Sequence, residues 1–415
     1  METSSGLGAS MSFSINTKEE FEKFTTSHWN TINEYIDSKF DRDFTPIYSS
    51  VDIRESKTKL APVDHNMYPA GFNNLCALDL DYASEVFELA IKNINKDTSV
   101  VGLIPESHTK NLFYLDHLAM LGKAISDAGF EVRFLSFDNN LFGEESELNL
   151  VSHSQFDLHI TKAKIVNGEI YGADKKIDFA ILNNDQSDKI EIDWSEVTTP
   201  INPTPLIGWY ARQKNKHFHF YNQVVEEFAN EFSINPDLLQ AKFKAVEDVD
   251  FSSKQGLEML GAAVDELKSD LPEDKKIFVK ASKGTYGMGI SVVSNGEEII
   301  SMNRKARNKM DVGKNKIKFT SLLVQEGVET IIKYDDMPAE VAIYLVDGKS
   351  VGGFMRVNKE KSADGNLNSR GMVFRKFCIS EIRQNQDHKS KEAMYTVVAR
   401  LATLASTLEI KEVTN

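Results

Sequence analysis

The chain has 415 residues, more than one ordinary hydrophobic core accommodates, so the sequence predicts two or three subdomains packed together. Apolar residues make up 41% and aromatic residues 10%, which is typical of a globular protein and excludes a largely disordered chain. The 62 acidic residues outnumber the 48 basic ones, leaving a net charge of −14. Such a surface repels nucleic acid and anionic membranes, and no apolar run approaches the ~18 residues of a membrane helix. We therefore expect neither partner, whereas a local basic pocket can still bind a small anion.

The segment 1–16 is rich in Gly and Ser and lacks the basic and apolar parts of a signal peptide. We expect a disordered tail and a cytoplasmic location. The two cysteines, Cys76 and Cys378, offer neither a disulfide framework nor a metal-ligand spacing. We interpret both as buried small residues in a reducing compartment, because no His/Asp constellation marks either as a nucleophile.

The first half of the chain alternates helix and strand patterns. Apolar residues at helical spacing predict a helix over 17–40, whereas residues 46–80 look irregular. Two apolar runs, 99–106 and 131–137, flank a helical pattern, which predicts a βαβ unit with parallel strands. A further strand at 178–185 ends in polar residues, where open α/β sheets place ligands.

Strand patterns dominate the second half, after two amphipathic helices around Val224–Phe232 and Leu257–Leu271. The pair Asp347-Gly348 between two of these strands is typical of a tight β-hairpin. The predicted elements are strands at 277–282, 290–294, 321–328, 339–348 and 349–358, a helix at 297–310 and a last helix through Met394–Leu408. The sequence therefore predicts an α/β first half and an antiparallel α+β second half.

A glycine-rich segment, FVKASKGTYGMGISVV, carries the clearest chemical signal. It places Lys280 on a strand before Gly284, Gly287 and Gly289. Glycines let backbone N–H groups approach phosphate oxygens, and a lysine adds positive charge. The order G-x-x-G-x-G joins two strands, which distinguishes it from the dinucleotide-binding motif and from the P-loop. Taken alone, the segment fits a ligand-free glycine-rich hairpin as well.

The segments that follow add polar residues suited to a nucleotide. An apolar strand ends in Gln325–Val328, whose backbone groups and carboxylate suit adenine and ribose. The next hairpin bears Glu340 and Arg356, and Arg356 suits neutralisation of a transferring phosphoryl group. The same two residues also fit a surface cross-strand ion pair of little energetic worth. In the loop beyond, Asn366 and Asn368 can reach a metal or a substrate.

These segments together resemble the ATP-grasp fold. More narrowly, the chain is similar to the proteobacterial ATP-grasp family of glutamate–cysteine ligases, through segments that span residues 50–374. The longest are DHNMYPAGFNNL (64–75) and KASKGTYGMGI (280–290). The resemblance implies a fold of α/β plus α+β class, with an ATP-grasp domain preceded by a Rossmann-like α/β domain. The expected divisions are an α/β substrate-binding domain at 17–200, a helical connector at 201–270 and the ATP-grasp nucleotide-binding domain at 271–415.

The resemblance also implies an activity. A glutamate–cysteine ligase joins L-glutamate and L-cysteine through γ-glutamyl phosphate, using ATP and Mg²⁺, as the first step of glutathione biosynthesis. Lys280 and Arg356 would be the catalytic residues. The expected ATP contacts are Lys280, Gly284, Thr285, Tyr286, Gly287, Met288, Gly289, Gln325, Glu326 and Val328.

The amino-acid substrates carry an α-carboxylate and an α-ammonium, so their site needs cationic groups and acceptors. The candidates are Arg54, Asp64, Asn73, Glu106, Asp185, Arg212, Lys214 and Asn368. The last helix is not followed by the Glu-x-Asn pair that often binds Mg²⁺ in ATP-grasp enzymes, so we assign the metal to Glu340, Asn366 and Asn368. His217 and His219 we interpret as packing residues beside phenylalanines, since no third ligand accompanies them.

Two other functions stay open from the sequence. One is another ATP-grasp carboxylate–amine ligase, similar to glutathione synthetase, because amino-acid specificity depends on geometry. The other is a nucleotide-binding regulator without catalysis, against which Lys280 and Arg356 argue. A homo-oligomer is compatible with either function.

Overall fold

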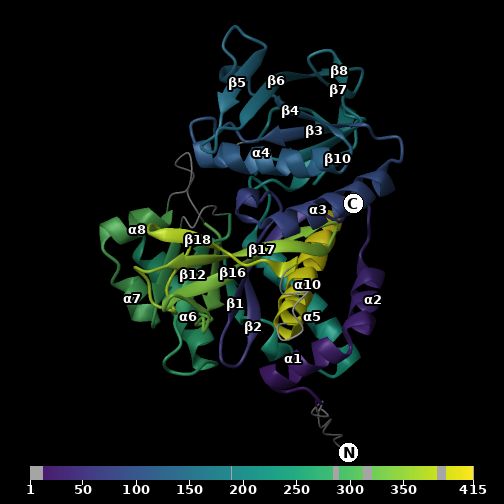
Figure 1. Cartoon of the computed structure of the whole chain (residues 1–415). Helices are drawn as coiled ribbons and strands as arrows, with labels where there is room; N and C mark the ends of the chain where they lie inside the picture. Colours follow the sequence, from purple (N-terminus) through teal and green to yellow (C-terminus); the bar gives the residue numbers. More distant parts are fainter. Residues whose placement is uncertain (1–12, 188, 284–288, 312–319, 381–388, 415) are drawn as a thin grey trace, which may run out of the picture.

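The computed structural model describes residues 13–187, 189–283, 289–311, 320–380 and 389–414. The predicted ATP contacts Gly284, Thr285, Tyr286, Gly287 and Met288 lie outside these ranges. Within them the strands form three sheets (Figure 1), which meet around the site described below.

The central sheet is antiparallel and combines strands from both ends of the chain, in the order β18-β17-β16-β1-β2 with β15 paired to β16. Its described strands are β1 (Tyr48–Glu55), β2 (Leu60–Asn66), β15 (Lys333–Tyr334), β16 (Met337–Val346), β17 (Lys349–Asn358) and β18 (Met372–Lys376). Because β1 pairs with β16, the expected domains 17–200 and 271–415 share one sheet. The tight turn predicted at Asp347-Gly348 joins β16 to β17, with φ angles of 49° and 72°.

The prediction of irregular structure over 46–80 is wrong. β1 is buried along its whole length, with Val51 and Ile53 in the core. Ser50, Asp52 and Arg54 alternate with them, and the polar side chains interrupt the apolar run that marks a buried strand. The alternation of polar and apolar residues identifies this strand, and the prediction overlooked it.

The second sheet has a parallel core, in the order β10-β9-β3-β4-β6. Its described strands are β3 (Val100–Pro105), β4 (Glu131–Ser136), β5 (Glu147–Val151), β6 (Asp157–Val166), β7 (Glu169–Gly172), β8 (Lys175–Lys176), β9 (Phe179–Asn183) and β10 (Ile201–Asn202). Helix α4 (Leu112–Asp127) connects β3 to β4, which confirms the predicted βαβ unit. Helix α3 (Ala77–Ile94) packs with α4 between this sheet and the central one.

The third sheet is antiparallel, in the order β11-β14-β12-β13. Its described strands are β11 (Phe243–Val246), β12 (Ile277–Ala281), β13 (Ile290–Val293) and β14 (Leu322–Glu326), and its helices are α6 (Lys254–Ser269), α7 (Gly296–Ile300) and α8 (Arg304–Asp311). Because β11 and α6 precede residue 271, this unit begins upstream of the expected boundary. The single helix predicted over 297–310 is two helices.

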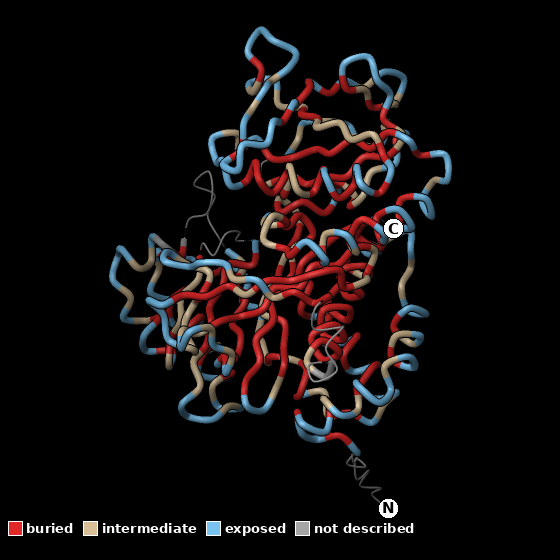
Figure 2. The backbone as a smooth tube through the Cα atoms, in the orientation of Figure 1, coloured by how far each residue is buried: buried red, intermediate tan, exposed pale blue. Residues whose placement is uncertain are grey.

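The other face of the central sheet is covered by α1 (Lys18–Ser27), α5 (Lys214–Phe232) and α10 (Lys389–Thr414). The buried colour follows the central strands in Figure 2. The helix predicted over 17–40 is divided at His28 into α1 and α2 (Trp29–Lys39). Short 3₁₀ helices occur at Phe72–Asn74, Asn139–Leu141, Trp194–Glu196, Pro205–Ile207 and Pro236–Leu238.

Two predictions about the chain outside these layers are wrong. Of the tail expected over 1–16, residues 1–12 lie outside the described ranges, but Ile15 is buried and forms a β-bridge with Ile234, so residues 13–16 are packed against the protein. Cys76 and Cys378 form a disulfide across a sequence separation of 302 residues. A pair so far apart has no local sequence pattern, so the spacing gave no indication of it. The bond joins the N-terminus of α3 to the segment after β18.

Candidate active site

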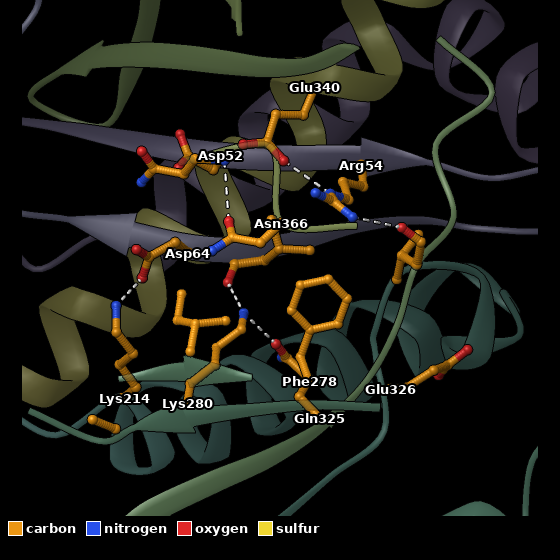
Figure 3. A pocket seen from close by; sticks show the side chains of 15 residues that line it. Asp52, Arg54, Asp64, Lys214, Phe278, Lys280, Gln325, Glu326, Glu340 and Asn366 are labelled. Carbon is orange, nitrogen blue, oxygen red and sulfur yellow. Dashed lines mark hydrogen bonds and ion pairs between the residues drawn. The ribbon is translucent and has the colours of Figure 1, made fainter. Parts of the chain in front are cut away.

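Two adjoining cavities lie over the polar face of the central sheet. The smaller, inner cavity lies against the third sheet, and the larger, outer cleft lies against the parallel sheet. Both cavities are lined by Asp52, Asp64, Lys214 and Asn368, which we call the junction. Figure 3 shows the inner cavity with its lining side chains.

A row of buried charges lies on the central sheet, with Asp52, Arg54 and Glu340 lining the inner cavity and Arg356 lining the outer cleft. Arg54 Nε donates to Glu340 Oε2 at 2.8 Å, and Arg356 Nη1 donates to Glu340 Oε1 at 2.5 Å and to Asp52 Oδ2 at 2.8 Å. Strand geometry creates the row, because Asp52 and Arg54 are two residues apart on β1 and Glu340 lies opposite Arg356. These side chains are between 4% and 11% exposed, so the alternative of a surface ion pair is wrong.

The row is electrostatically asymmetric. Burial and the neighbouring Glu340 raise the pKa of Asp52 in spite of Arg356. For Glu340, burial also disfavours the anion, but Arg54 and Arg356 outweigh it and hold the pKa below its ordinary value. Within the described ranges the buried Nε of Arg356 has no hydrogen-bond partner, and Arg356 lines the outer cleft. An arginine with an unused donor is suited to bind a carboxylate or a phosphoryl group.

The opposite wall of the inner cavity carries Lys280. Its Nζ donates to the carbonyl of Val63 and to Oε1 of Gln325, both at 2.8 Å. Burial lowers the pKa of Lys280 to about 8, in spite of Asp64 nearby. At the junction, Lys214 forms an ion pair with Asp64. Burial opposes ionisation of Asp64, but Lys214 and Lys280 outweigh it and lower the pKa of this carboxyl.

The predicted nucleotide contacts that the structure describes lie around this wall. Gln325, Glu326 and Val328 line the inner cavity, and Gly289 follows directly on the undescribed part of the glycine-rich loop. The buried Nε2 of Gln325 has no partner among the described residues. Glu326 accepts from Lys59 Nζ at 2.8 Å, and Figure 3 shows its carboxylate turned away from the charged cluster. Its predicted contact with ribose remains a prediction.

The three predicted metal ligands all line the inner cavity. Carboxylate and amide oxygens are the donors that Mg²⁺ prefers, so Glu340, Asn366 and Asn368 fit the ion chemically. Both oxygens of Glu340 already accept from arginines, and Asn366 Oδ1 accepts from the N–H of Asn368 at 3.1 Å. Binding of Mg²⁺ to these oxygens would therefore displace or weaken at least one of these hydrogen bonds.

The predicted substrate residues fall into two groups. Asp64, Lys214, Asn368, Asn73 and Asp185 line the outer cleft, and Arg54 lines the inner cavity. Arg212 lines neither, because its guanidinium binds Glu409 Oε1 at 3.0 Å and the carbonyl of His65 at 2.7 Å. Glu106 lines neither, and its Oε2 lies 2.5 Å from Nε2 of His108, which does line the cleft.

Several site residues escaped the sequence prediction. Asp52 was missed together with its strand, although the polar–apolar alternation of β1 contains it. Tyr68 and Trp209 line the cleft from segments without regular structure, where no periodicity marks a side chain as facing a ligand. His217 is buried on α5 and stacks on His65 at 4.6 Å, as expected for a packing residue, while His219 is exposed.

Comparisons with known proteins agree with this geometry. A family model described as Glutamate-cysteine ligase matches residues 22–410. A crystal structure named "Putative gamma-glutamylcysteine synthetase", from Methylobacillus flagellatus KT, is 33% identical, with a TM-score of 0.84, covering 95% of this chain and 96% of that one. The search of curated proteins gave no match. Among the described residues, no helix has the length and apolar character to cross a membrane. The chain belongs to the glutamate–cysteine ligase family, whose members are ATP-dependent ligases.

Proposed function

We propose that the two cavities divide the substrates of the glutamate–cysteine ligase reaction, with ATP in the inner cavity and the amino acids in the outer cleft. The observation that carries the proposal is the junction. Asp52, Asp64, Lys214 and Asn368 line both cavities, so a γ-phosphate entering from one side meets a carboxylate entering from the other. A phosphoryl transfer needs this arrangement, because both reactants must approach in line.

The inner cavity suits a nucleotide through its basic groups and unused donors. Lys280 would bind the β- and γ-phosphates together with the glycine-rich loop, and the unpartnered Nε2 of Gln325 would donate to the nucleotide. We assign this nucleotide site to an ATP-grasp fold, with the parallel sheet as its Rossmann-like companion. The sheet pairing of β12 with β13 brackets the loop, as the sequence motif predicts.

The chemistry proceeds in two steps. An oxygen of the glutamate γ-carboxylate attacks the γ-phosphorus, and the bond to the β-phosphate oxygen breaks, giving γ-glutamyl phosphate and ADP. The cysteine nitrogen then attacks the acyl carbon, and phosphate leaves as the amine loses a proton. Arg356 and Lys214 would neutralise the oxygens that gain charge, and the cavity walls would keep water from the acyl-phosphate.

We assign Mg²⁺ to Glu340, Asn366 and Asn368. When bound with ATP, the ion supplies positive charge to the phosphate oxygens. Arg54 would then share Glu340 with the ion and keep the carboxylate oriented. The cytoplasmic location and a homo-oligomeric state remain predictions.

The test is ADP release from the purified protein with ATP and magnesium, adding amino acids singly and in pairs. We expect release that needs glutamate together with cysteine, and a product with the mass of γ-glutamylcysteine. Lys280→Met should lower kcat by about 100-fold or more, since it removes a preorganised cation. Lys254→Met is the matched control, because that side chain is 85% exposed on α6.

Other results identify the alternatives. Release that needs γ-glutamylcysteine and glycine would indicate a glutathione-synthetase-like ligase. ATP binding without stimulation by any amino-acid pair would indicate a regulator and would refute the proposal.

A further inference from the structure

The parallel sheet has a topological switch point beside the outer cleft. From β3 the chain proceeds through β4 to β6 on one side, and β9 and β10 then lie on the other side of β3. Open α/β sheets bind ligands outside the carboxyl ends of the two strands at such a point. The carboxyl end of β9 leads directly to Asp185, which lines the cleft.

Tyr68 and Trp209 complete this corner of the cleft. The Tyr68 side chain is buried, with 8% of the residue exposed, yet within the described ranges its hydroxyl has no hydrogen-bond partner. Leaving a buried polar group without a partner is unfavourable, so an unpartnered hydroxyl on a residue that lines the cleft suits a ligand. Burial raises the pKa of this hydroxyl in spite of Arg212, with smaller contributions from Tyr210, Glu409 and Asp185, so it remains a donor at neutral pH.

The backbone holds Asp185 in a defined orientation. Its Oδ1 accepts from the N–H and the hydroxyl of Ser187, both at 2.8 Å, and its carbonyl accepts from the N–H of Trp209 at 2.8 Å. The next residue, Gln186, is fully buried with a φ of 48°. A left-handed backbone is uncommon at a non-glycine residue, so the surrounding contacts fix this turn and the orientation of Asp185 with it.

Chemistry decides which of the two substrate amino groups a carboxylate at this corner can bind. The cysteine nitrogen must expose a lone pair to attack the acyl carbon, so a carboxylate that stabilises its ammonium form opposes the reaction. The α-ammonium of glutamate keeps its charge throughout. Lys214 lies over Trp209, with Nζ 4.8 Å from the ring centroid, and also lines the junction, so the corner is next to the reacting end.

We propose that Asp185 binds the α-ammonium of the glutamate substrate and that the Tyr68 hydroxyl donates to its α-carboxylate. This inference rests on the proposed function and assigns the subsite that distinguishes glutamate from other dicarboxylates. Both residues are positioning residues, because neither touches the atoms that exchange bonds.

The experiment compares glutamate with glutarate, which has the reacting carboxylate but no α-ammonium. Wild-type protein should use glutamate with a kcat/KM at least about 10-fold higher. Asp185→Asn should lower kcat/KM for glutamate by about 10- to 100-fold and change the value for glutarate less than about threefold. Glu191→Gln is the matched control, because it neutralises an exposed carboxylate in the segment after β9.

Tyr68→Phe tests the second half of the proposal without endangering the fold. Because the hydroxyl has no partner in the free protein, the variant should unfold at the same temperature as wild type or higher. The KM for glutamate should rise about 10-fold while the KM for ATP stays unchanged.

The outcomes separate this inference from the proposed function. If Asp185→Asn remains folded and keeps the preference for glutamate over glutarate, the subsite is elsewhere, although release that needs glutamate and cysteine still supports the ligase. If wild-type protein shows no turnover, the proposed function fails. The rise in unfolding temperature caused by glutamate is then compared with that caused by glutarate. Equal rises in wild-type protein would overturn the assignment of the α-ammonium subsite to Asp185.

Discussion

Arg356 and Glu340 lie directly opposite each other on β17 and β16, with 2.5 Å between Nη1 and Oε1. The other oxygen of Glu340 binds Arg54 on β1, so the carboxylate connects two guanidinium groups across three strands. Arg356 is thereby held on the wall of the outer cleft, bonded to Asp52 of the junction, and its Nε–H has no partner among the described residues. The pairing of Arg356 with Glu340 thus has two roles: it stabilises buried charges in the central sheet, and it orients Arg356 for the proposed transfer of a phosphoryl group.

Replacing Arg356 separates these two roles. Arg356→Met leaves Asp52 and Glu340 buried without this cation, so the free energy of unfolding should fall by about 3–5 kcal/mol. Arg356→Lys keeps the charge but loses the fork of donors, and kcat should fall by about 100- to 1000-fold in a folded protein. Urea unfolding and ADP release measure the two effects. Arg133→Met, on the partly exposed β4, is the control, and an active Arg356→Lys would contradict the catalytic role.

Lys280 should make ATP binding depend on pH. Its pKa of about 8 means that the free protein loses this charge as the pH rises through 8. Bound phosphates favour the charged form and raise the pKa, so ATP binding near pH 8.5 should take up protons. Calorimetry in two buffers of different ionisation enthalpy measures the uptake. An arginine at position 280 stays charged, so ATP binding to Lys280→Arg should take up fewer protons than binding to wild type. Equal proton uptake by both proteins would mean that a group other than Lys280 binds the proton.

The sequence predicted what depends on local pattern. The strands around Lys280, the strands and helix of the βαβ unit and the turn at Asp347-Gly348 each follow from periodicity or turn chemistry within the element itself. The alternation within β1 is a local signal that the prediction overlooked, whereas the failures at the site depend on contacts distant in sequence. Strand β1 pairs with β16 almost 300 residues later, so its polar residues face a cavity that no local window reveals. Arg212 has the charge of a substrate contact, but the partner that occupies it, Glu409, is on the last helix.

The disulfide between Cys76 and Cys378 contradicts the expectation of two unpaired cysteines and can be tested chemically. The protein unfolded without reductant should titrate no free thiol, and after reduction it should titrate two. Closing a loop of 302 residues stabilises a protein by about 6 kcal/mol in the chain-entropy model, so reduction should lower the unfolding temperature. Cys76→Ser should unfold at the temperature of reduced wild type and no longer respond to reductant. Two thiols without reduction would refute the bond.

The buried network around Glu409 predicts how stability depends on acid. Burial opposes ionisation of Glu409, but Arg212 and His217 outweigh it, so the pKa lies below its value of 4.5 in the unfolded chain. The stabilisation is therefore complete above pH 4.5 and is lost as the pH falls through the folded-state pKa. Glu409→Gln should be less stable than wild type at pH 7 by about 3–5 kcal/mol, because it leaves Arg212 buried without its anion.

The comparison across pH makes this prediction specific. The difference in free energy of unfolding between wild type and Glu409→Gln should shrink as the pH falls below 4.5. Arg212→Met should lower stability by a similar amount, and once folded at low temperature it should retain the KM values of wild type for both amino acids. Glu412→Gln is the control, one helical turn away and half-exposed beside Lys216. A selective rise in the KM for glutamate in Arg212→Met would restore Arg212 as a substrate contact, because a purely structural role acts on stability alone.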